Sequence, residues 1–146
     1  MTDTQKHLLE QELQLLGDAT EVLTYSFDKC AKIGIKAAYL PDELESFESL
    51  TSRFARLSDI LIQKVFRLID RLDLETEGSI RDRINRAEKK DLIGSAEIFV
   101  EIRMLRNDIA HEYLREAIQE LYVNVLSLTP ALLDSVERVK KYCEKF

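Results

Sequence analysis

The residues with the clearest chemical potential lie in one short string, Arg106–Tyr113, in which an arginine precedes a histidine by five positions. Arg106 offers a planar fork of N–H donors that matches a phosphate group. Histidine is the side chain that most often removes or donates a proton in catalysis, and His111 is a candidate for that role. Asn107 precedes His111 by four positions, and on a helix its amide can fix which ring nitrogen carries the proton. Together these side chains suit metal-free cleavage of an RNA phosphodiester by the neighbouring 2′-hydroxyl.

A helix with Ser95 as its N-cap is predicted to carry this string as far as Glu112 or Tyr113. On this helix an apolar seam of Ile98, Ile102, Leu105 and Ile109 separates two polar flanks. The basic flank consists of Arg103, Arg106, Asn107, Ala110 and His111, and the acidic flank consists of Glu97, Glu101, Asp108 and Glu112. A merely solvated helix would more often interleave opposite charges. The asymmetry indicates a functional face; the alternative is that these polar side chains only cap the ends of neighbouring helices.

Helical patterns also cover the rest of the chain, which has only four glycines and two prolines among 146 residues. Apolar residues at three- and four-residue spacing predict helices over residues 4–33, 41–72, 80–90 and from 114 onward. Pro130 falls inside the last of these and is expected to kink it or to split it in two. The sequence therefore predicts an all-α fold, an antiparallel four- to five-helix up-and-down bundle that forms one domain over residues 1–146.

The short helix predicted over residues 80–90 carries many cations. Ser79 is its expected N-cap, with Asp82 in the place of the usual glutamate of a capping box. A candidate RNA-binding rim consists of Arg86, Lys89 and Lys90 on this helix, together with Arg103 on the next. The alternative is an ordinary solvated helix.

The overall charge and the cysteine count limit the classes of function. A formal net charge of −6 argues against an extended nucleic-acid surface, but it leaves room for a local basic pocket. Cys30 and Cys143 fall on apolar faces of predicted helices, which indicates buried, reduced thiols. With two cysteines and two histidines, we expect neither a metal nor a cofactor. We expect a cytoplasmic protein, since no apolar run approaches the length of a membrane span and no leader opens the chain.

The string Arg106-Asn107-x-x-x-His111-x-Tyr113 resembles the signature of the HEPN superfamily, and most closely the R-x4-H-x-Y motif of the HepT toxins. Residues 80–94 are similar to the segment that precedes the motif in those proteins. The resemblance extends to the helical plan of the whole chain, whereas only the eight residues of the string carry specificity.

The resemblance implies a metal-independent endoribonuclease toxin that acts on RNA. Arg106 and His111 would be its catalytic pair, with Asn107 and Asp108 as supporting polar residues. It also implies a homodimer in which two such helices face a shared cleft. Each chain would then supply half of a site.

Tyr113 has a separate implied role. In HepT relatives the motif tyrosine accepts AMP from a partner nucleotidyltransferase of the MntA type, which silences the toxin. Negative charge added there would stand where an RNA phosphate must bind. The chain also resembles, more loosely, helical proteins that serve minimal nucleotidyltransferases as non-catalytic substrate-binding subunits. A third interpretation is a helical scaffold whose basic flank pairs with acids of another chain.

Overall fold

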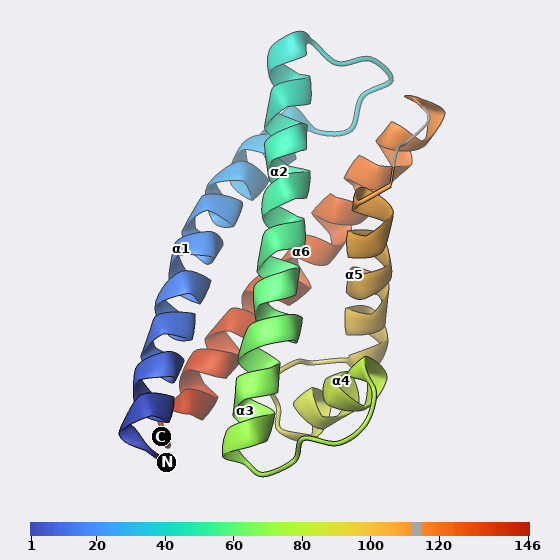
Figure 1. The fold of residues 1–146 in the computed structure, drawn as a ribbon. Coiled ribbons are helices and arrows are strands. Elements are labelled where there is room, and N and C mark those ends of the chain that lie inside the picture. The colour runs from blue at the N-terminus through green and yellow to red at the C-terminus, as the bar shows by residue number, and fades with distance from the viewer. Residues whose placement is uncertain (112–114) are drawn as a thin grey trace.

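Four long helical segments run lengthwise through the molecule, and a short helix lies at one end (Figure 1). The computed structural model describes residues 1–111 and 115–146. Its helices are α1 (Asp3–Ile33), α2 (Pro41–Asp59), the π-helical segment η1 (Ile60–Val65), α3 (Phe66–Leu72), α4 (Ile80–Lys89), α5 (Ala96–Ile109) and α6 (Arg115–Cys143). Because α2, η1 and α3 follow one another without a break, they form one rod. The predicted all-α antiparallel bundle is confirmed.

Side-chain caps fix where the helices begin. The Ser79 hydroxyl accepts a hydrogen bond from the backbone of Asp82, and the Asp82 carboxylate accepts one in return from the backbone of Ser79. Ser95 caps α5 by accepting from the backbone N–H of Ile98 at 3.3 Å. Both predicted caps are confirmed. They satisfy N–H groups that a helix leaves without partners at its start.

The π-helical segment in the middle of the rod was not predicted. At its end the N–H of Phe66 bonds to the carbonyl of Leu61, five residues back. A return from this spacing to the four-residue spacing of an α-helix leaves one carbonyl without a helical donor. The carbonyl of Ile62 accepts instead from Nη1 of Arg83, on α4, at 3.1 Å. The irregular segment thus ties α4 to the rod.

α6 continues through Pro130 as a single helix, so the expected split is wrong. Proline removes one backbone hydrogen bond and costs roughly 3 kcal/mol inside a helix. Pro130 is exposed, where water can bond the carbonyl that loses its donor, and the flanking Val125 and Leu132 are fully buried. Packing of α6 against the core therefore outweighs the local defect.

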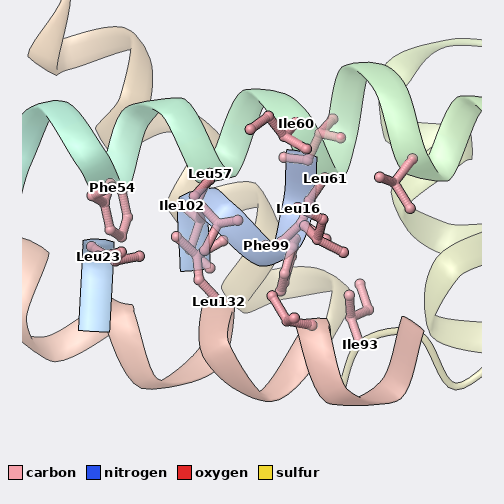
Figure 2. Packing of buried hydrophobic residues seen from close by; sticks show 14 of the residues in the cluster. Leu16, Leu23, Phe54, Leu57, Ile60, Leu61, Ile93, Phe99, Ile102 and Leu132 are labelled. Atoms are coloured by element: carbon pink, nitrogen blue, oxygen red, sulfur yellow. The ribbon is translucent and has the colours of Figure 1, made fainter. Parts of the chain in front are cut away.

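The core runs along the axis between the four long segments. Figure 2 shows Leu16 of α1, Phe54 and Leu57 of the rod, Ile102 of α5 and Leu132 of α6 converging on it. Its four largest fully buried side chains are Phe47, Phe54, Phe66 and Phe99. Within the described parts of the chain, no helix has the length and apolarity that crossing a membrane requires.

The two cysteines are buried free thiols, as predicted. Burial raises the pKa of the Cys30 thiol to about 11, although Lys29 acts in the opposite direction. Burial likewise raises the pKa of Cys143 to about 11. Both thiols are therefore protonated at neutral pH and behave as small apolar side chains.

Candidate functional site

α5 places its basic flank against the α2–η1 part of the rod. Phe99, Ile102 and Leu105 are buried, and α5 packs on α2 and α6. The predicted apolar seam is wrong at Ile98, which is 40 % exposed, because the helix buries the i, i+3 row that passes through Phe99. Ile109 is half-buried at the C-terminal end of α5. This packing of α5 fixes the positions of the polar residues on its exposed side.

A carboxylate from the rod holds Arg106 in place. Nε of Arg106 donates to Oδ1 of Asp59 at 2.6 Å, and Nη2 donates to Oδ2 at 3.0 Å. The hydrogen bonds to Asp59 raise the pKa of Arg106, so its charge is permanent. Within residues 1–111 and 117–146, no protein group accepts a bond from Nη1 of Arg106. Asp59 therefore holds the Arg106 side chain in place, and the N–H groups of Nη1 remain available to a ligand.

Two adjoining hollows flank the Arg106–Asp59 pair, and together they form what we call the α2–α5 cleft. One hollow, of about 530 Å³, extends to Ile109 and Ala110. The other, of about 480 Å³, extends to Asn107. The charged residues that line the cleft are Arg56, Asp59, Lys64, Arg103 and Arg106. Four cations against one carboxylate make this surface locally positive in a chain whose net charge is −6.

Three of these lining residues come from the rod and were not predicted as site residues: Arg56, Asp59 and Lys64. The sequence does hold a signal for them. Between Glu48 and Asp70, Asp59 is the only acid, and it lies among several cations on a helix that is otherwise largely apolar. A carboxylate in that setting indicates a cation from another element, although the sequence does not tell which one.

His111 lies beyond the end of α5, which corrects the predicted helix. α5 ends at Ile109 with Ala110 as its C-cap, and the backbone N–H of His111 bonds to the carbonyl of Asp108 at 3.0 Å. The predicted i, i+4 pairing of Asn107 with His111 on one helical face is therefore wrong. The His111 side chain is exposed. It directly follows Ala110, a lining residue of the cleft, but His111 is itself not among the lining residues of either hollow.

The two supporting residues are placed differently from each other. Asn107 is exposed and lines the cleft beside Arg103 and Arg106. Asp108 is exposed too, but it is not among the lining residues. Of the two, Asn107 is the one within the site.

The candidate rim residues fall into two environments. Arg103 lines the cleft, and Lys89 is exposed on α4. Arg86 donates from Nε and Nη2 to Oδ2 of Asp70 at 3.1 and 2.8 Å, which raises its pKa. Lys90 donates to Oδ1 of the same carboxylate at 3.0 Å. Arg86 and Lys90 thus already hold an internal carboxylate that joins α4 to α3.

The expected AMP acceptor, Tyr113, lies outside the described residues. Among the residues that are described, no group of three or more His, Cys, Asp or Glu side chains is arranged to hold a metal ion. The polar groups that line the α2–α5 cleft are its four cations, the Asp59 carboxylate, the side-chain amides of Asn107 and Gln63 and the hydroxyls of Ser52 and Ser58.

Neither protein-family models nor curated proteins match this chain.

Proposed function

We propose that this chain is the toxin of a toxin–antitoxin pair, a metal-independent endoribonuclease of the HEPN type that cleaves cellular RNA in the cytoplasm. The observation that carries the proposal is the fixed guanidinium of Arg106 in the wall of a cationic cleft. A cleft with four cations attracts the phosphates of a single RNA strand. Asp59 orients Arg106 before substrate arrives, which is the form in which an electrostatic catalyst is most effective.

In this proposal the reaction uses the RNA's own nucleophile. The 2′-oxygen attacks the adjacent phosphorus, and the bond from phosphorus to the 5′-oxygen of the next nucleotide breaks. His111 takes the proton from the 2′-hydroxyl, and the leaving 5′-oxygen receives a proton from a second acid. Nη1 of Arg106 bonds the phosphate oxygens on which negative charge develops. The products are a 2′,3′-cyclic phosphate and a 5′-hydroxyl.

The requirement for a second acid supports a homodimer. The only other histidine, His7, lies near the start of α1, at the opposite end of the bundle from the C-terminal end of α5 (Figure 1). It is therefore too distant to serve the same reaction within one chain. A second copy would bring its own His111 and would double the positive charge facing the RNA.

A second candidate function is a non-catalytic substrate-binding subunit of a minimal nucleotidyltransferase. The ion pair between Arg106 and Asp59 favours this function, because an ion pair whose only role is to join α5 to the rod would have the same geometry. In that case the cleft binds the enzyme's substrate and His111 has no chemical role.

A cleavage assay in EDTA tests the proposal. The wild-type protein should cut cellular RNA or tRNA and leave 5′-hydroxyl ends, whereas His111→Ala should lose about 100-fold or more of the rate, since general acid–base catalysis contributes that much. His7→Ala is the matched control, because it removes the other exposed histidine and should leave the rate unchanged. Equal activity in all three proteins would reject the proposal. An inactive wild-type protein, free of AMP, that co-purifies with a nucleotidyltransferase would establish the second candidate.

If the antitoxin is a nucleotidyltransferase, as proposed, a further prediction concerns Tyr113. Co-expression with a neighbouring minimal nucleotidyltransferase should increase the intact mass of the chain by one or more AMP units, and Tyr113→Phe should abolish the increase. The modified protein should be inactive, because the added phosphates oppose the phosphates of RNA. An unchanged mass after co-expression, or an increase that survives Tyr113→Phe, would contradict this control mechanism.

A further inference from the structure

A second basic hollow lies between α3, α4 and the loop that joins them. Its volume is about 190 Å³, less than half that of either part of the α2–α5 cleft. The lining residues are Arg67, Asp70, Arg71, Thr76, Arg83 and Arg86. We call this hollow the arginine pocket.

Positive charge in the arginine pocket exceeds what its one carboxylate can balance. Four guanidinium groups face Asp70, and the oxygens of Asp70 already accept from Arg86 and from Lys90. The side chains of Arg67 and Arg71 donate to no group within residues 1–111 and 117–146. Like charges held together at a surface raise the free energy of the folded chain unless an anion joins them.

Arg83 is the member of the pocket that has a buried donor without a partner among the described residues. Its Nη1 bonds the Ile62 carbonyl, but its Nε is buried with no partner among the described residues. Burial lowers the pKa of this guanidinium, Asp70 opposes the effect, and the charges of Arg67, Arg86 and Arg71 add to the lowering. Native proteins rarely leave a buried charged donor without an acceptor, and such a donor indicates a missing anion or water.

We propose that the arginine pocket binds a phosphate group. A phosphate offers oxygens in several directions, which suits guanidinium groups that line the pocket from both α3 and α4, and its negative charge offsets the excess of cations. The hydroxyl of Thr76 adds a neutral donor from the loop. The volume of about 190 Å³ is sufficient for a phosphate group.

The phosphate can come from an RNA strand or from a small phosphorylated molecule. The Ile62 carbonyl accepts from Arg83, and Ile62 also lines the α2–α5 cleft, so one hydrogen bond joins a lining residue of the arginine pocket to a lining residue of the cleft. An RNA strand in the cleft can therefore reach the arginine pocket with a further phosphate. The binding of phosphate does not depend on the proposed cleavage, so each can fail alone.

The test uses the full chain carrying His111→Ala, so that RNA remains intact whether or not the wild-type protein cleaves it. Arg67→Gln/Arg71→Gln removes two exposed cations from the pocket without breaking a hydrogen bond. Lys6→Gln/Lys141→Gln removes two exposed cations elsewhere and is the matched control. The melting temperature is measured in inorganic phosphate and in chloride at equal ionic strength. Fluorescence anisotropy then gives the dissociation constant of a short single-stranded RNA.

Inorganic phosphate should raise the melting temperature of the parent and the control above the value in chloride, and the pocket variant should lose this increase. If the pocket variant also binds RNA about tenfold or more weakly than the control, the phosphate belongs to RNA. If its RNA affinity equals that of the control, the ligand is a small phosphorylated molecule. No phosphate-specific increase in the parent, or the same increase in the pocket variant, would overturn the proposal.

Discussion

Arg106→Ala is expected to lower the rate constant for RNA cleavage by about 100- to 1,000-fold, the effect of removing one oriented donor from a developing oxyanion. The loss should appear in kcat, because Nη1 bonds the phosphate most strongly when its charge increases in the transition state. Arg106→Lys should recover little of the rate. A lysine keeps the charge but cannot both hold Asp59 from two nitrogens and present a third to the phosphate.

The loss of activity in Arg106→Ala should not reflect unfolding. The side chains of Arg106 and Asp59 are 32 % and 42 % exposed, and ion pairs so open to water stabilise a protein by less than about 1 kcal/mol. Urea unfolding of the variant should therefore resemble that of the wild type. Folding and catalysis can be measured on the same preparation.

Arg103→Ala supplies the matched control for Arg106→Ala. It removes the same charge from the same cleft, but no carboxylate among the described residues orients Arg103. We expect a loss of less than about tenfold, mainly in KM, and a shallower dependence of binding on salt. Equal losses of kcat in Arg103→Ala and Arg106→Ala would show that the cleft acts only through its total charge. Asp59→Asn should fall between the two, since it leaves Arg106 present but less firmly oriented.

Local signals in the sequence were sufficient to predict most of the helices. Ser79 and Ser95 were identified as N-caps because hydroxyls before apolar runs bond backbone groups only three residues away. Apolar spacing predicted the long helices for the same reason: a helical face is determined by residues within one or two turns. These features do not depend on what lies across the bundle.

The end of α5 was predicted too far along the chain. The apolar spacing continues to Ile109, and no glycine or proline follows to end the helix. Asn107 and Asp108 have low helix propensity, however, and the charge of Asp108 opposes the negative end of the helix dipole. These two effects are small, and they became decisive only because Ala110 and His111 are exposed and gain no packing energy from helical structure.

The pairing of charges could not be predicted from spacing at all. Arg106 and Asp59 are 47 positions apart, and Arg86 and Asp70 are 16 apart on different helices. Their contacts depend on how α5 and α4 pack against the rod. The sequence therefore identified the cations of the candidate site and rim, whereas only the fold shows that some hold internal carboxylates and others face a cleft.

Asp70→Ala is expected to lower the free energy of unfolding by about 3 to 5 kcal/mol, the usual result of removing one partner from a buried charge cluster. Asp70 is 4 % exposed and accepts from Nε and Nη2 of Arg86 and from Nζ of Lys90. Without the carboxylate, the Arg86 and Lys90 side chains, which are only 18 % and 11 % exposed, keep their charges with fewer partners. Urea denaturation followed by circular dichroism measures the change.

Asp134→Ala is the control, because it removes a carboxylate of the same kind from an exposed pair. Asp134 accepts from Nε of Arg138 at 2.7 Å within α6, and its side chain is 56 % exposed. Water screens this pair, so its removal should cost less than about 1 kcal/mol. A small effect of Asp70→Ala, equal to that of the control, would mean that Arg86 and Lys90 turn outward without penalty. Arg86 and Lys90 would then be available to bind RNA as a rim. A large effect instead identifies Asp70 as the carboxylate that keeps Arg86 and Lys90 inside the fold. In that case Arg67, Arg71 and Arg83 are the cations that remain available to bind a phosphate.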